Sequence, residues 1–272
     1  MQWWCSAQTA AWNWDWRLYP GVWVFVAGLL VGRWLLARRL ETRSTAAQER
    51  RQRSIVFFAG ALTLWVALDW PLGALGAGYL ASAHMLQFLL VALVAPPLLL
   101  YGSPPGFYDA IRRRHLVHRA LYVLTHPLLA IIFFNVVLVT THWPGVVDHL
   151  MVSQAGSLML DMAWLVSGLV LWWPLVAPEP ERPGFNYLYK VGYLILATIL
   201  NTPAFAWLTF AEMPLYATYE LAPPISGIPT RVDQQIAGLL MKVGGAAIFW
   251  TAITILFFRW YQSEERPGDA LP

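Results

Sequence analysis

Four residues of this sequence are best suited to metal chemistry: two histidines and an aspartate in one short stretch, and a histidine in an earlier apolar run. His142, Asp148 and His149 fall within a single short stretch, and His84 lies in a long apolar run. Two imidazoles and a carboxylate suit a borderline divalent ion, whereas a methionine thioether suits Cu(I). The candidate metal ligands are therefore His84, His142, His149, Asp148 and Met85.

The same stretch also has a purely structural interpretation, and the sequence leaves both open. In that interpretation His142 ends a helix at the lipid headgroups, and Asp148 and His149 lie on a short interfacial segment. Pro144 and Gly145 argue against a continuous helix before Val146. A metal signal of this kind is much weaker than a paired-cysteine motif.

The composition requires lipid around most of the chain. Of the 272 residues, 58% are apolar and only 12% are charged, against about a quarter charged in a typical soluble domain. No hydrophilic stretch is long enough for a second domain, so residues 1–272 form a single transmembrane domain. The basic residues sit in short loops between apolar runs, which excludes a nucleic-acid-binding face. The chain has one cysteine, Cys5, and no cleavable signal peptide is expected.

Seven apolar runs are long enough to cross a bilayer, since a helix needs about 20 residues to span the hydrocarbon core. We expect an all-α, seven-transmembrane-helix bundle with spans at 19–37, 54–72, 78–101, 121–141, 151–176, 188–210 and 235–260. Pro96 and Pro97 should kink or end the third span. The sequence Asn201-Thr202-Pro203 predicts a break inside the sixth.

Lysine and arginine alternate between the two sides of this arrangement and give its orientation. By the positive-inside rule, the basic connections are cytoplasmic, the N-terminus is outside and the C-terminus is inside. The basic connections carry Arg38, Arg39, Arg43, Arg50, Arg51, Arg53, Arg112, Arg113, Arg114, Arg119, Arg182, Lys190, Arg259 and Arg266.

The polar residues of the spans, which cost free energy to place in a membrane, fall in the outer half of this bundle. Ionisable groups in a membrane cost several kcal/mol and usually face a bundle interior or a wet cavity. The expected intramembrane polar cluster comprises Asp69, Gln87, Asp161, Asp233 and Lys242. Within it we predict an outward-facing cavity with an ion pair between Asp161 and Lys242. Helix packing alone is the alternative role for these residues.

Several motifs, in this order along the chain, resemble the CtaG family of bacterial cytochrome c oxidase assembly proteins. They are Pro20-Gly21-Val22-Trp23, Ala83-His84-Met85-Leu86-Gln87-Phe88 with Ala95-Pro96-Pro97, His126-Pro127, His142-Trp143-Pro144 with Asp148, Trp172-Trp173-Pro174, and Asp233-Gln234-Gln235-Ile236-Ala237-Gly238. The resemblance covers nearly the whole chain. It implies a seven-helix protein of the bacterial cytoplasmic (inner) membrane that assists assembly of a haem–copper oxidase, with oxidase subunits as partners, copper as the metal handled at the outer face, and no turnover of its own.

This chain departs from the family pattern at three places that bear on copper. The family typically has a second histidine where Phe88 stands, and histidines in the first half of the fifth helix, where this chain offers Gln154 and Asp161. It also tends to have an uncharged residue at the position of Lys242. We therefore hypothesise that Lys242 substitutes electrostatically for a missing cation.

Other classes of membrane protein remain as alternatives. A stable accessory subunit of the oxidase or a copper or ion transporter would also place polar groups in the bundle. Lys242 in the last helix invites comparison with retinal proteins, but the third helix offers His84 and Gln87 instead of a carboxylate counter-ion. No nucleophile–base pair is recognisable, so no enzyme activity is expected. The sequence does not determine the oligomeric state.

Overall fold

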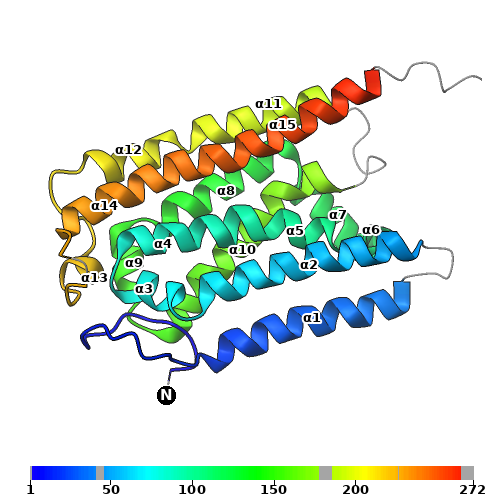
Figure 1. Cartoon of the computed structure of the whole chain (residues 1–272). Helices are drawn as coiled ribbons and strands as arrows, with labels where there is room; N and C mark the ends of the chain where they lie inside the picture. The colour runs from blue at the N-terminus through cyan, green and yellow to red at the C-terminus, as the bar shows by residue number, and fades with distance from the viewer. Residues whose placement is uncertain (1, 41–45, 178–185, 226, 265–272) are drawn as a thin grey trace, which may run out of the picture.

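The computed structural model describes residues 2–40, 46–177, 186–225 and 227–264. Arg43, Arg182 and Arg266 of the basic connections lie outside these residues. Within the described part every regular element is a helix, as the sequence predicts. The helices lie roughly side by side along one axis (Figure 1).

The seven predicted spans all fall on helical stretches, several of which are broken. The stretches are α1 (Pro20–Leu40); α2 (Ala47–Leu68) with α3 (Leu72–Gly78); α4 (Ala81–Phe88), η1 (Leu89–Val94) and α5 (Ala95–Tyr101); α7 (His115–Leu124) with α8 (Pro127–Thr141); α10 (Gln154–Val176); α11 (Tyr187–Leu200) with α12 (Thr202–Phe210); and α14 (Thr230–Leu239), η3 (Leu240–Gly244) and α15 (Gly245–Glu264). Short helices α6 (Phe107–Arg112), α9 (Pro144–Leu150) and α13 (Ala217–Glu220) complete the order.

Five of these stretches are long and apolar enough to cross a membrane without a sharp bend, and the number rises to seven if each bent pair is one span. The pair α2 and α3 bends by 44°, and the pair α7 and α8 bends by 72°. The chain is therefore a multi-pass, all-helical membrane protein. Pro127 lies at the first turn of α8, where its missing N–H costs nothing.

The third span changes helix type before its two prolines instead of ending there. Leu89–Val94 is a π-helical stretch, and Pro96 and Pro97 occupy the first turn of α5. Both prolines thus stand at the start of α5, where a missing N–H is tolerated. The predicted break in the sixth span is also present, because Asn201 separates α11 from α12.

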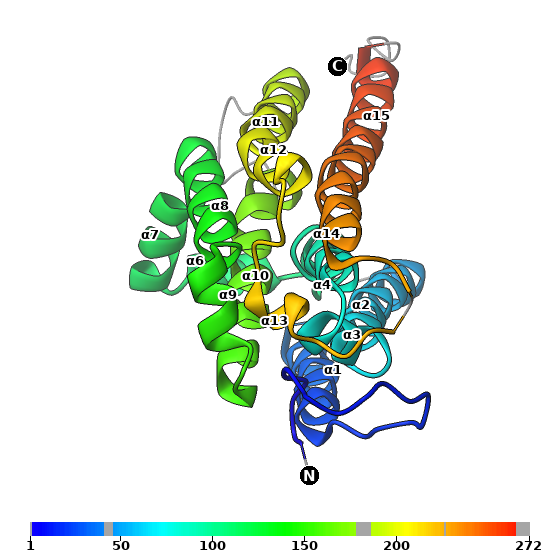
Figure 2. The same ribbon diagram turned by 90° about the vertical axis from the view of Figure 1, so that its left-hand side faces the viewer.

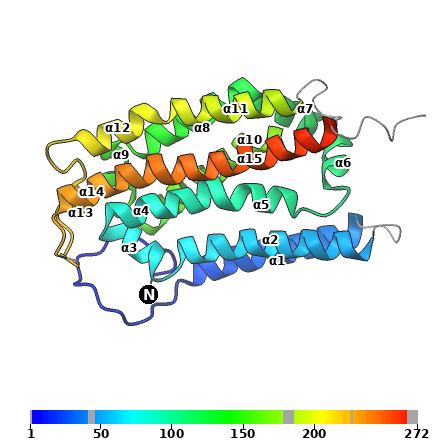
Figure 3. The ribbon, with the colours of Figure 1, turned by 45° about the horizontal axis from the view of Figure 1, so that its top comes forward.

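The stretch from α4 to α5 is the centre of the bundle. In its most apolar window 72% of the residues are buried, against 6% in that of α1. The stretch packs on α2, α10 and α14. The pair α11 and α12 runs beside α14 and α15 (Figure 2), and α1 packs mainly on α2 (Figure 3). We call the end that carries residues 2–19, α3, α9 and α13 the N-terminal end, and the opposite end the basic end (Figure 1).

Candidate functional site

The segment of residues 2–19 folds over the N-terminal end of the bundle. Its Trp4 and Cys5 side chains are almost completely buried. The amide N–H groups of Trp3 and Trp4 donate to Oε1 of Gln154 at 2.7 and 3.3 Å. The Ala7 N–H donates to the Met151 carbonyl at 2.8 Å. These bonds hold the segment against α10 and the loop before it.

Beneath this segment, the buried carboxylate of Asp161 is satisfied by two neutral donors. Trp4 Nε1 donates to Oδ2 at 2.7 Å, and Gln87 Nε2 donates to Oδ1 at 2.9 Å. The three residues come from the N-terminal segment, α4 and α10. Asp161 therefore ties three separate parts of the chain together.

The predicted ion pair between Asp161 and Lys242 is wrong. Lys242 Nζ instead donates to Thr202 Oγ1 at 2.8 Å and lies 5.1 Å from the ring centre of Phe205. Neutral N–H groups satisfy Asp161 without the desolvation of an ammonium group. Lys242 meets the hydroxyl exposed at the break between α11 and α12.

Two further members of the expected polar cluster hold helices in place. Asp69 Oδ2 accepts a 3.0 Å hydrogen bond from Trp23 Nε1, which links α1 to the end of α2. Asp233 accepts from the Ala81 N–H at 2.6 Å and from the N–H and hydroxyl of Ser82. Its negative charge thus caps the positive end of α4. Among the five residues, the structure shows a hydrogen bond only between Gln87 and Asp161.

Two of the predicted metal ligands, His84 and His142, do lie together. Their rings pack edge to face with centres 5.8 Å apart, and both side chains are buried. Trp164 flanks both, with ring centres 4.9 Å from His84 and 5.8 Å from His142. The imidazoles thus sit in an aromatic enclosure near the N-terminal end.

The hydrogen bonds of His142 leave one of its nitrogens open. Nδ1 lies 2.8 Å from the Leu138 carbonyl oxygen, and since a carbonyl can only accept, Nδ1 must carry the proton. Nε2 is then an unprotonated nitrogen, and it has no hydrogen-bond partner. An imidazole held by one N–H on a carbonyl is how protein histidines are usually oriented toward a metal. Burial lowers the pKa of His142 to about 4, so the ring is neutral at pH 7.

A small cavity of about 10 Å³ adjoins His84 and brings several donor types together. Its walls include the Cys5 thiol, the Met151 thioether and the side chains of Gln87, Ser157 and Asp161. Both nitrogens of His84, Oε1 of Gln87 and Oγ of Ser157 have no hydrogen-bond partner. The cavity is only about as large as the smallest space that holds a water.

These donors fit a soft monovalent ion better than a divalent one. Nowhere in the described ranges do three His, Cys, Asp or Glu side chains form a metal-binding group. Thiol, thioether and imidazole donors together are the set that Cu(I) prefers. The Cys5 thiol donates a hydrogen bond to the Leu68 carbonyl at 3.2 Å. The Met151 thioether accepts a hydrogen bond from the Tyr219 hydroxyl at 3.5 Å.

The remaining predicted ligands lie apart from this enclosure. Asp148, on α9, accepts from the backbone N–H groups of Ala217 and Thr218 at the start of α13. His149 is exposed on the same short helix, which begins at Pro144 itself because proline suits the first position of a helix. Met85 is buried, but it does not line the cavity beside His84.

Sequence reasoning missed the contribution of the N-terminal segment. Trp4 and Cys5 complete the enclosure from residues about 80 positions before His84. The only signal was the density of tryptophan in an otherwise polar stretch, because a solvent-exposed tail has no reason to carry so many. Only the fold places the Met151 thioether beside His84.

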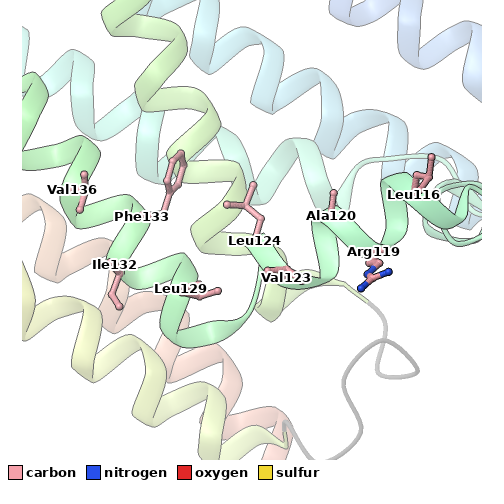
Figure 4. A pocket seen from close by; sticks show the side chains of 9 residues that line it. All are labelled: Leu116, Arg119, Ala120, Val123, Leu124, Leu129, Ile132, Phe133 and Val136. Atoms are coloured by element: carbon pink, nitrogen blue, oxygen red, sulfur yellow. The ribbon is translucent and has the colours of Figure 1, made fainter.

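A larger hollow in the bend between α7 and α8 lacks such donors. Its volume is about 690 Å³, and its lining comes from the facing sides of the two helices (Figure 4). The lining is apolar except for Arg119. Nothing in it suits metal or acid–base chemistry.

The fold and this enclosure define a multi-pass helical membrane protein. At one end it holds two buried imidazoles, each with a nitrogen that has no hydrogen-bond partner. The model of the cytochrome c oxidase caa3 assembly factor family (Caa3_CtaG) matches residues 9–263, nearly the whole chain. The chain therefore belongs to this family, which confirms the resemblance found in its motifs. Searches of curated proteins and of solved structures gave no match.

Proposed function

We propose that this protein assists assembly of a haem–copper cytochrome c oxidase by holding Cu(I) at the N-terminal end of its bundle. The observation that carries the proposal is the buried pair of imidazoles, with open nitrogens on both His84 and His142. Family membership supplies the assembly role. The protein acts as a metal-holding partner of oxidase subunits and catalyses no reaction of its own.

The ligands proposed are His84 and His142, with sulfur from Met151 or Cys5. Buried polar atoms without partners cost about 1–3 kcal/mol each. A bound Cu(I) ion would recover part of this cost, because it accepts lone pairs without bringing hydrogen-bond requirements. The thiol and thioether beside His84 favour Cu(I) over Zn²⁺ or Cu²⁺.

The positive-inside rule assigns the N-terminal end to the outer face of the bacterial cytoplasmic membrane. Copper held there would be accessible to oxidase subunits in the same membrane. The segment of residues 2–19 covers the enclosure, so transfer requires this segment to move or a partner to displace it.

A Cu(I) competition titration on the purified full-length protein tests the proposal. The protein is titrated against a chromophoric Cu(I) chelator, together with His84→Gln, His142→Gln and, as matched control, His149→Gln. We expect one tightly bound Cu(I) in the wild type and in the control, and at least tenfold weaker binding in the other two variants. Absence of Cu(I) binding, or equal effects of all three substitutions, would refute the copper role.

The assembly role has its own readout in cells. Deleting the gene should abolish the copper signal of the oxidase while haem spectra remain, and His84→Gln should reproduce this defect. An assembly factor should co-purify with oxidase subunits only while assembly is in progress. Stoichiometric recovery with the mature enzyme would instead identify a stable accessory subunit.

A further inference from the structure

A groove between α1 and α2 lies at the basic end, far from the imidazole enclosure along the bundle axis. Its volume is about 640 Å³, within the range of about 300–1,000 Å³ that ligand pockets occupy. The two helices run side by side over this length (Figure 3). We call this feature the α1–α2 groove.

Charged and apolar side chains line different depths of the α1–α2 groove, except for Arg33, which lies deeper in α1 and donates to the Gly102 carbonyl. In α1, Arg38 lies one turn beyond Trp34 and two turns beyond Leu30. In α2, which runs the other way, Arg50 lies two turns before Phe57. The guanidinium groups of Arg38 and Arg50 are thus at the basic end, and the apolar side chains lie deeper toward the middle of the bundle.

Of the three arginines that line the groove, Arg33 donates to the Gly102 carbonyl at 3.0 Å. Arg38 and Arg50 form no ion pair with a carboxylate of the described residues. The ion pairs found there join Arg53 to Glu49 and Arg112 to Asp109. Arg38 instead lies over the Trp34 ring, 3.6 Å from its centre, which fixes its guanidinium beside the groove. Arg50 is half-buried. Two positive charges therefore face one opening, which favours an anion.

We propose that the α1–α2 groove is a binding site for an anionic glycerophospholipid. Its phosphodiester would lie between Arg38 and Arg50, and an acyl chain would follow Leu30 and Phe57 into the membrane. An amphipathic lipid matches the order of charged and apolar residues, whereas a free anion would use only the arginines. Since only 6% of the residues in the most apolar window of α1 are buried, lipid reaches the groove directly. Basic pockets between helices on the positive side of membrane proteins are known to select such headgroups.

Lipid retention by the full-length protein tests this site. The protein is reconstituted in nanodiscs of mixed phosphatidylglycerol and phosphatidylcholine, extracted into detergent, and weighed by native mass spectrometry. Removing two surface arginines should weaken binding of the anionic lipid about 30-fold. We therefore expect the wild type to retain phosphatidylglycerol and Arg38→Gln/Arg50→Gln to lose it.

The matched control removes the same charge elsewhere at the basic end. Arg113 and Arg114 are exposed and lie outside the groove, so Arg113→Gln/Arg114→Gln should retain phosphatidylglycerol like the wild type. Circular dichroism checks that both double variants keep their helical content. Equal loss in the control would mean general surface attraction and would overturn the proposal.

Two further outcomes would also overturn it. Equal retention of phosphatidylcholine by the wild type would remove the selectivity for an anion. Displacement of phosphatidylglycerol by millimolar inorganic phosphate alone would show a simple anion site with no role for the acyl chain. Selective loss in Arg38→Gln/Arg50→Gln without phosphate competition supports the lipid site.

Discussion

At the scale of single residues, the enclosure near the N-terminal end holds polar atoms that the protein itself does not satisfy. Both nitrogens of His84 and Nε2 of His142 have no hydrogen-bond partner. Asp161, in the wall of the same cavity, is fully satisfied by Trp4 and Gln87. The contrast separates a residue that holds the fold from residues that are open to a ligand.

Asp161 and Lys242 should contribute to stability independently. Asp161→Ala leaves the N–H groups of Trp4 and Gln87 unpaired and should cost about 2–4 kcal/mol. Lys242→Met removes one bond to Thr202 and should cost at most about 1 kcal/mol. The double variant should equal the sum within about 0.5 kcal/mol, measured as the free energy of unfolding in mixed micelles. A coupling free energy above about 1 kcal/mol between the two substitutions would instead indicate an ion pair between Asp161 and Lys242.

The thiol of Cys5 should react abnormally slowly, with a shifted pH dependence. Burial, and then the carboxylates of Asp161 and Asp69, raise its pKa well above the usual value. A raised pKa means less thiolate at any given pH, so alkylation should still accelerate about tenfold per pH unit at pH 9, where an exposed thiol levels off. Iodoacetamide labelling followed by mass spectrometry measures this. Rapid labelling at pH 7.5 in the folded protein would show that the N-terminal segment does not cover the site.

At the scale of elements, a glycine allows α10 to approach the central stretch of the bundle closely. Pro96 and Pro97 have no N–H, so neither can bond the Ala92 carbonyl in an α or a π turn. That carbonyl lies against Gly168 of α10, where an added Cβ would sit 2.1 Å from its oxygen. Gly168 therefore permits the close contact between α10 and the centre of the bundle.

Gly168→Ala should destabilise the protein by about 1–3 kcal/mol, because the added methyl group forces α10 away from η1 and α5. Gly192→Ala in α11 is the matched control, since a Cβ there meets no atom within 4 Å. The control should be neutral or stabilising by up to about 1 kcal/mol. Thermal denaturation in detergent compares the two, and equal midpoints would contradict the close approach of α10 at this position.

At the scale of the whole molecule, the bundle has a buried centre and a peripheral first helix. The stretch from α4 to α5 carries His84 and Gln87 through the middle of the molecule, while α1 faces outward along most of its length. The two proposed sites follow this division. The metal enclosure lies around the central stretch, and the lipid groove lies between the peripheral helix and its neighbour.

The two ends of the bundle should lie on opposite sides of the membrane. In a Cys5→Ala background, Trp14→Cys at the N-terminal end and Arg114→Cys at the basic end place single thiols on exposed positions. A membrane-impermeant maleimide should label the first in intact spheroplasts and the second only after lysis. The reverse pattern would invert the orientation, and labelling of both in intact spheroplasts would contradict the spans between them.

The sequence alone determined the class of this protein, because the length of apolar runs and the placement of arginines depend on the bilayer and not on how helices pack. It also singled out His84 and His142 as candidate ligands, and the fold brings their rings together. Only the tertiary structure decided which polar groups meet. Asp161 and Lys242 looked like partners at similar depth, yet depth says nothing about the direction in which a side chain points around its helix axis. The fold turned Asp161 toward Trp4 and Lys242 toward Thr202, and it brought Cys5 and Met151 beside His84 from distant parts of the chain.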